Sequence, residues 1–193
     1  MKRTVIFYSL FFLCVITNAQ TLVNFYLKPD GTFQTNEGNS FVVIEYEGKT
    51  AQELFNLVKA NVLTLYNNPQ HVLNEIEPSN ITIRALSDKL YSTYKLGAAF
   101  VEYRAMYTLV FQFKDGRIRI NAPLVDRQLD VTATAVPIPK TFVSLIDDWF
   151  DKDGNVKKKK KDSVAKIEMM FNYPINYLLG NLQQKTSTEN DDW

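Results

Sequence analysis

Two stretches in the first half of the chain have the apolar pattern of β-strands. Residues 41–46, FVVIEY, are β-branched and aromatic and end just before Gly48, which is typical of a buried strand. Residues 81–86, ITIRAL, alternate apolar with polar side chains. Because successive side chains of a strand point to opposite faces, this alternation predicts a strand with one face on the core and one in solvent.

Residues 101–122 predict a β-hairpin with Asp115-Gly116 as its two-residue turn. In that register Phe113 lies opposite Ile118, Phe111 opposite Ile120 and Leu109 opposite Ala122. All six apolar side chains then share one face, whereas Gln112 and Arg119 lie on the other. The turn and the alternation therefore predict the same register independently.

Three apolar stripes at helical spacing predict three helices. Thr50 and Glu53 form a capping box at the start of the first helix, and Asn67-Asn68-Pro69 ends it. Pro174 lies inside the third stripe and predicts a kink or a split there. The stripes are Leu54, Phe55, Val58, Val62, Leu65 and Tyr66; Phe142, Leu145, Ile146 and Trp149; and Val164, Ile167, Phe171, Ile175, Leu178 and Leu182.

Residues 20–40 predict an N-terminal arm or a short hairpin. The turn signal Pro29-Asp30-Gly31 separates two candidate strands, at residues 22–27 and 32–34. We expect this arm to lead into a single domain over residues 41–183.

Two further segments predict little regular structure. Residues 124–140 lie among Pro123, Pro137 and Pro139 and predict a loop with at most one short strand. Residues 184–193 are polar and predict a frayed tail.

The N-terminus has the layout of a secretory signal peptide over residues 1–19. Lys2 and Arg3 precede an uncharged apolar run that ends at Ile16, and Ala19 supplies the small residue before a cleavage site. A membrane anchor usually needs about 20 apolar residues, and this run is shorter. We therefore expect cleavage after Ala19, no stable membrane span in the mature chain, and a secreted or periplasmic location.

Charge and composition exclude several classes of function. Cleavage would remove two basic residues and Cys14, which leaves a mature chain with 20 basic and 21 acidic residues and no thiol. Nucleic-acid binding usually depends on a strongly basic face, so we expect no nucleic-acid partner. With one histidine, no G-x-S-x-G and only scattered glycines, the sequence predicts no catalytic residues, no metal site and no cofactor.

The stretch DKDGNVKKKKKD, residues 151–162, partly matches a twelve-residue calcium loop between two helices. Asp151, Asp153 and Asn155 occupy its first, third and fifth positions, where oxygen ligands belong. Against this, Val156 replaces the glycine of the sharp turn and Asp162 replaces the longer bidentate glutamate. The lysines that follow Val156 would also repel a divalent cation.

We therefore expect residues 151–162 to be a solvated connector. Asp153-Gly154-Asn155 turns the chain, and Asp162 or Ser163 caps the next helix. The lysine run can alternatively contact anionic head groups or a phosphorylated partner, although nearby aspartates nearly balance its charge.

Two groups of residues form the candidate interaction surface. Four tyrosines, at positions 91, 94, 103 and 107, could line a groove for a ligand, but Tyr103 and Tyr107 share the apolar face of the long strand and are expected in the core. The two groups are Tyr91, Tyr94 and Lys95, in a predicted loop, and Lys157, Lys158, Lys159, Lys160 and Lys161.

Carboxylate pairs keep a hydrolase open as one alternative. The pairs are Glu45 with Glu47, Glu75 with Glu77, and Asp147 with Asp148. A glycosidase needs two carboxyl groups opposed across a cleft, which proximity in sequence does not supply.

The order of a buried strand, a capped helix, a strand and a long hairpin ending in YTLVFQFKDGRIRI resembles the DUF4468 family of exported bacterial proteins of unknown function. The resemblance covers about residues 41–122. It implies a fold like that of the TATA-binding protein, in an envelope location, and it brings no catalytic residues.

We expect an α+β domain, a curved antiparallel sheet with helices packed on one face. The leading hypothesis for its function is an exported, non-enzymatic binding module that contacts an unknown protein or small molecule of the envelope. A carrier of an apolar small molecule, with a cavity lined by Phe100, Leu109 and Phe111, is the first alternative, and a hydrolase is the second.

Overall fold

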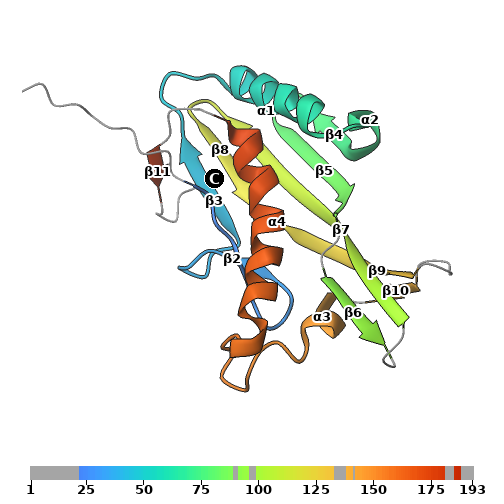
Figure 1. Cartoon of the computed structure of the whole chain (residues 1–193). Coiled ribbons are helices and arrows are strands. Elements are labelled where there is room, and N and C mark those ends of the chain that lie inside the picture. The colour runs from blue at the N-terminus through green and yellow to red at the C-terminus, as the bar shows by residue number, and fades with distance from the viewer. Residues whose placement is uncertain are drawn as a thin grey trace, which may run out of the picture.

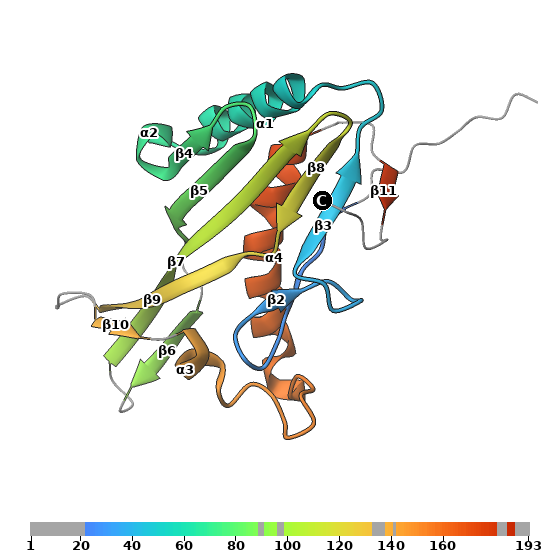
Figure 2. The same cartoon turned by 180° about the vertical axis from the view of Figure 1, so that it is seen from behind.

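The computed structural model describes residues 22–88, 91–95, 99–132, 138–140, 142–180 and 185–187. The predicted signal peptide, residues 1–19, lies outside the described residues. Within the described part, nine strands form one sheet, and the two long helices α1 and α4 lie on the same side of it (Figures 1 and 2). The predicted α+β class, with an antiparallel sheet and helices on one face, is confirmed.

The described helices are α1 (Ala51–Leu65), α2 (Pro69–Val72), α3 (Phe142–Ile146) and α4 (Lys161–Leu179), with a short 3₁₀ helix at Lys158–Lys160. The strands are β1 (Tyr26–Leu27), β2 (Phe33–Gln34), β3 (Phe41–Glu45), β4 (Leu73–Ile76), β5 (Asn80–Leu86), β6 (Tyr91–Lys95), β7 (Ala99–Lys114), β8 (Arg117–Asn121), β9 (Leu124–Thr132), β10 (Ile138–Lys140) and β11 (Lys185–Ser187).

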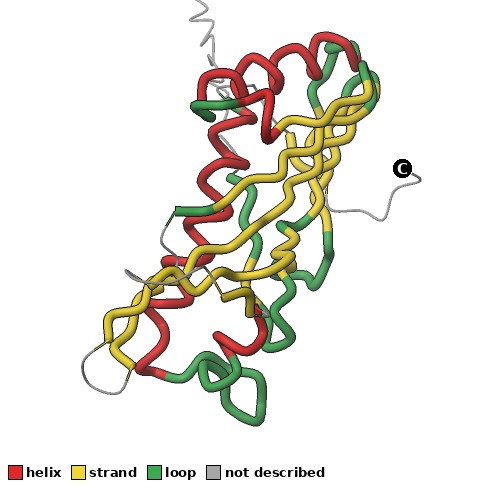
Figure 3. The backbone as a smooth tube through the Cα atoms, turned by 90° about the vertical axis from the view of Figure 1, so that its right-hand side faces the viewer, coloured by secondary structure: helices red, strands yellow, loops and turns green. Residues whose placement is uncertain are grey.

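The long strand β7 organises the sheet, because four other strands pair with it. β5 and β6 each pair antiparallel with part of β7, and so do β8 and β9. β4 extends the sheet beyond β5, β10 extends it beyond β9, and β3 and β11 extend it beyond β8. Figure 3 shows the strands as one twisted layer beside the helices.

The predicted hairpin register is confirmed at its turn and changes further along. Phe113 pairs with Ile118 and Phe111 with Ile120, with Gly116 at φ +77° in the turn. The predicted pair of Leu109 with Ala122 is not formed, because β8 ends at Asn121. After Pro123 the chain continues along β7 as β9, where Leu124 pairs with Thr108.

The predicted loop over residues 124–140 is therefore wrong for most of its length. The nine residues of β9 pair with the unusually long β7, and this pairing outweighs the loop signal of the surrounding prolines. Pro139 lies in β10, which pairs with β9 alone in the described part. An edge strand tolerates proline because its outer side needs no backbone donor.

α1 begins as predicted and is also tied to the hairpin turn. The Glu53 backbone N–H donates to Thr50 Oγ1 at 3.2 Å, and the Thr50 backbone N–H donates to Glu53 Oε2 at 2.8 Å. The Ala51 N–H donates to Asp115 Oδ1 at 2.8 Å, so the β7–β8 turn supplies a further acceptor at the helix start. The residues of α1 that face the core are Leu54, Phe55, Val58 and Val62.

α4 runs from Lys161 to Leu179 through Pro174, so the predicted split does not occur. Its stripe is buried as predicted, while Leu182 lies outside the described residues. The predicted cap at Asp162 or Ser163 is wrong, because Lys160 occupies the N-cap position after the 3₁₀ turn and Asp162 lies in the first helical turn. There its carboxylate can interact favourably with the helix dipole.

Side chains of α4 hold the extended N-terminal segment through its backbone. Asn172 Oδ1 accepts from the Phe25 N–H and its Nδ2 donates to the Phe25 carbonyl, both at 2.9 Å. Asn176 makes the same pair of bonds to Val23, and Glu168 Oε1 accepts from the Leu27 N–H at 2.9 Å. These three α4 residues are spaced four apart, so they follow one face of the helix. Phe25, Val23 and Leu27 are buried in the core as a result.

Four short elements were not predicted. β4 and α2 fill the connection between α1 and β5, and β6 occupies the predicted loop around Tyr91. Residues Lys185–Ser187, within the predicted polar tail, pair with β3 as β11. Each of these strands is short and polar, so its sequence alone carries a weak strand signal.

The described helices include none that combines the length and the apolar character needed to cross a membrane.

Replacing Asn172 by alanine should destabilise the protein strongly. Asn172 is only 8% exposed, and its loss leaves the N–H and the carbonyl of Phe25 buried without partners. We expect the free energy of unfolding in urea to fall by about 2–4 kcal/mol. Asn56→Ala is the control, because this exposed α1 side chain bonds only to Gln52 among the described residues, and its loss should cost less than about 0.5 kcal/mol. Equal effects of the two substitutions would contradict the role given to Asn172.

Glu168 should make stability depend on pH. Its half-buried position raises the pKa of the carboxyl above the ordinary 4.5, although the Leu27 N–H and nearby Lys28 act in the opposite direction. The raised pKa means that this group contributes most to stability when protonated, below about pH 4.5, and that the contribution is lost as the pH rises through the folded-state pKa.

Glu168→Gln keeps a carbonyl oxygen for the Leu27 N–H and removes the charge. We therefore expect the stability of this variant, relative to the natural chain, to increase between pH 4 and pH 7 in urea titrations. Parallel pH profiles for the two chains would show that Glu168 has no raised pKa.

Candidate functional site

None of the described helices lies on one face of the sheet, and we call this the open face (Figure 2). Alternation along β5, β7 and β8 divides the side chains between the two faces. Ile81, Ile83, Leu109, Phe111, Ile118 and Ile120 are fully buried beneath α1 and α4. The open face consists of the intervening positions of these strands and of β3 and β4: Phe41, Val43, Glu45, Asn74, Ile76, Asn80, Thr82, Arg84, Leu86, Arg104, Met106, Thr108, Val110, Gln112, Lys114, Arg117, Arg119 and Asn121.

Cations outnumber carboxylates on the open face. The described side chains on or beside it include five cations and two carboxylates, Glu45 and Asp126. Asp126 is paired with Arg84 at 3.0 Å. The five cations are Arg84, Arg104, Lys114, Arg117 and Arg119. Because the whole chain has a formal net charge of only +1, this excess is a local property of one face.

Aromatic and amide groups lie among these cations. The Arg119 guanidinium stands 4.1 Å from the centre of the Phe41 ring, a cation–π contact across neighbouring strands. Gln112 Oε1 and Asn121 Oδ1 are buried without hydrogen-bond partners in the described part of the chain, and so is Arg104 Nε. A buried polar atom without a partner costs about 1–3 kcal/mol, which a bound partner with matching groups would recover.

The predicted surface at Tyr91, Tyr94 and Lys95 has a different backbone from the one expected. These residues form strand β6, paired with β7, so the predicted loop is wrong. Their side chains lie outside the described part of the structure. Tyr103 and Tyr107 are buried, as predicted, and Tyr107 bonds to the Tyr66 hydroxyl at 3.1 Å.

The lysine run lies outside the strands of the open face and leads into α4, which begins at Lys161. Lys157, Lys158, Lys159 and Lys161 are exposed, while Lys160 lies 3.4 Å from the Asp148 carboxylate and over the Trp149 ring. The Lys157 ammonium donates to the Asp148 carbonyl at 2.8 Å. The contacts of Lys157 and Lys160 thus hold the connector against the segment that directly follows α3.

The Asp151 side chain stabilises the turn of this connector. Its Oδ1 accepts from the backbone N–H groups of Asn155 and Asp153, both at 2.9 Å, and these hydrogen bonds lower the pKa of the Asp151 carboxyl. Within the described ranges, no three His, Cys, Asp or Glu side chains are grouped so that they could hold a metal ion.

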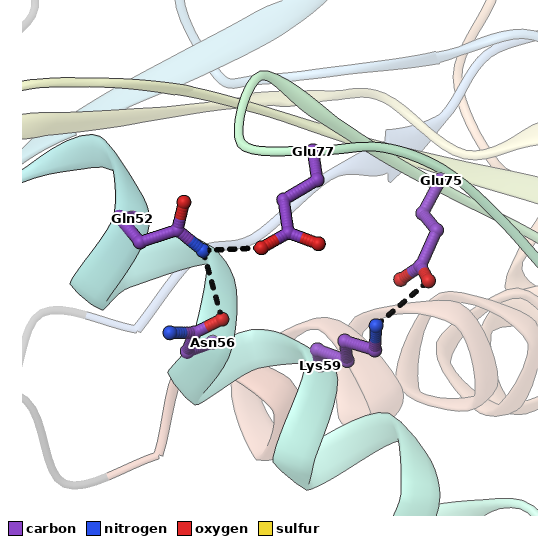
Figure 4. Close-up of polar contacts among 5 residues, drawn as sticks. All are labelled: Gln52, Asn56, Lys59, Glu75 and Glu77. Carbon is purple, nitrogen blue, oxygen red and sulfur yellow. Dashed lines mark hydrogen bonds and ion pairs between the residues drawn. The ribbon is translucent and has the colours of Figure 1, made fainter.

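One of the three carboxylate pairs that a hydrolase could use, Glu75 with Glu77, is engaged by α1 (Figure 4). Glu75 forms an ion pair with Lys59 at 2.7 Å, and Glu77 accepts from Gln52 Nε2 at 2.7 Å. Glu45 lies on the open face with Arg117 as its Cα partner in β8. These groups tie elements together, and none of these contacts opposes two carboxyls across a cleft.

The structure has no cavity for an apolar ligand at Leu109 and Phe111, two of the residues expected to line one. Leu109 and Phe111 are fully buried in the continuous core, and the side chain of Phe100 lies outside the described part. A cleft of about 390 Å³ opens instead where the β1–β2 hairpin meets α3 and the β8–β9 junction. No local sequence pattern indicates this cleft, because it depends on contacts between segments far apart in the chain.

Sequence reasoning also missed an apolar stripe on the outer side of α4. Met169, Tyr173 and Tyr177 are 66%, 60% and 38% exposed, and the two tyrosine rings lie 6.1 Å apart. Their spacing of four residues could have revealed the stripe, but it was hidden beside the stronger buried stripe of the same helix.

Comparison with known proteins assigns no family to this chain. No family model matches the chain, and no curated protein matches it. Membership of the DUF4468 family therefore stays a prediction. Among solved structures, the chain is similar to a TBP-like protein from Parabacteroides distasonis, with 15% sequence identity and a TM-score of 0.41 over 72% of this chain and 81% of that one.

Proposed function

We propose that the protein is an exported binding module of the bacterial envelope that carries out no chemistry and binds an acidic partner protein through the open face. The observation that carries this proposal is the excess of cations on that face, next to buried polar atoms that have no partner in the described part of the chain. The signal-peptide pattern of residues 1–19 supports export.

The chemistry of the open face suits a protein partner. Guanidinium groups bind carboxylates with paired hydrogen bonds, and four of the five cations on the face are arginines. If the Gln112 and Asn121 side chains turn outward on binding, their amide oxygens, which are buried in the free chain, accept hydrogen bonds from donors of the partner. The exposed Leu86 and Ile76 add apolar area near the same face.

The closed core favours this reading over a carrier that encloses its cargo. Tight packing of Phe55 against Phe113, with ring centres 5.6 Å apart, and of Tyr107 against Phe171, at 5.4 Å, fills the space between the sheet and the helices.

A photo-crosslinking amino acid placed at two positions tests the proposal in the exporting cell. Leu86, on the open face, is 44% exposed, and Met169, on the outer side of α4, is the control at 66%. We expect a discrete protein adduct from position 86 and none from position 169. Adding Lys114→Glu should lower the yield on the order of tenfold at low salt, because it reverses a charge on the face.

Lys166→Glu makes the same charge change on the exposed side of α4 and should leave the adduct unchanged. The proposal fails if the adduct from position 86 is insensitive to Lys114→Glu, if only position 169 reacts, or if the adduct contains nucleic acid.

A further inference from the structure

The cleft of about 390 Å³ at the edge of the sheet is built from three separate segments. Figure 2 shows β2, α3 and the start of β9 around this part of the molecule. Its volume lies within the usual range for small-molecule sites, about 300–1,000 Å³. The walls come from the β1–β2 turn, the β8–β9 junction and α3.

Close packing between the hairpin turn and α3 holds the walls in place. A Cβ atom at Gly31, where φ is +82°, would come within 2.9 Å of Val143 Cγ2, so only glycine allows this approach. Below it, the rings of Phe33 and Phe142 stack with their centres 6.3 Å apart, and both side chains are buried. The cleft therefore has a rigid aromatic base.

The rim of the cleft exposes apolar side chains. Leu124 is 61% exposed and Val143 is 44% exposed, and Pro123 lies beside Leu124 at the β8–β9 junction. A ligand with an apolar body would bury these side chains together with the aromatic base, and removing apolar area from water favours binding.

The charged side chains that line the cleft are both carboxylates, Asp30 and Asp126. Thr32 donates to Asp30 Oδ1 from its hydroxyl at 2.7 Å and from its N–H at 2.9 Å. Arg84 likewise uses only Oδ2 of Asp126. Asp30 Oδ2 and Asp126 Oδ1 thus accept no hydrogen bond from any other described residue. The hydrogen bonds from Thr32 also lower the pKa of Asp30, so its carboxylate stays charged in mildly acidic solution.

We infer that this cleft binds a small organic cation, in which an ammonium group on an apolar body reaches the open carboxylate oxygens of Asp30 and Asp126. The apolar body lies against Leu124, Val143 and the aromatic base. The site adjoins the open face, because Asp126 also pairs with Arg84 there, but its ligand has the opposite charge to the partner proposed for that face.

Titration of the mature chain, residues 20–193, with benzylammonium ion tests the inference by two-dimensional amide NMR. We expect saturable shifts at Gly31, Leu124 and Val143. Benzyl alcohol has the same ring without the charge and should bind about tenfold more weakly, because a charged donor is worth roughly that much more than a neutral one.

Two variants probe the chemistry without removing the fold. Asp30→Asn keeps an Oδ1 acceptor for Thr32 and should weaken benzylammonium about tenfold. Val143→Arg places a cation at the exposed rim and should abolish binding, whereas Lys166→Glu, on α4, should leave it unchanged. Unperturbed α1 amide signals would show that each variant is folded.

The inference is overturned if benzyl alcohol binds as tightly as benzylammonium, if Asp30→Asn has no effect in the folded variant, or if saturable shifts are absent from the cleft.

Discussion

Backbone pairing along β7 is the constraint on which the rest of the fold depends. This strand is 16 residues long, and its two edges pair with β5 and β6 on one side and with β8 and β9 on the other. Its alternating side chains then assign every neighbouring strand a buried face and an open face, because paired residues share a face. The core beneath α1 and α4 and the cationic open face are two consequences of the same register.

The cleft is a consequence of the way in which β8 passes into β9. Phe111 pairs with Ile120, but Thr108 pairs with Leu124, so the return chain contains one more residue than the part of β7 that it follows. The extra residue falls around Ala122-Pro123, where the ladder is interrupted. Leu124 is exposed beside this break, and the β1–β2 hairpin and α3 close the space around it. An irregularity in pairing thus supplies a concave surface that a regular sheet would lack.

Local signals in the sequence predicted the parts of the fold that local physics determines. The capping box of α1, the Asp115-Gly116 turn and the apolar stripe of α4 depend on residues close together in the chain, and the structure contains all three. β9 and β6 were missed because they are strands only by virtue of pairing with β7. The open face could have been anticipated, because Arg117 and Arg119 alternate with Ile118 and Ile120. The cleft and the hydrogen bonds between Asn172 and Phe25 could not, because they join segments that no local pattern connects.

Native mass spectrometry of the chain, purified gently at low salt from the cells that produce it, tests the central claim most directly. A binding module with a cationic open face should be recovered with a second polypeptide, and the complex should dissociate as the ionic strength is raised. Recovery of the chain alone, or with no companion but a small molecule, would contradict the account.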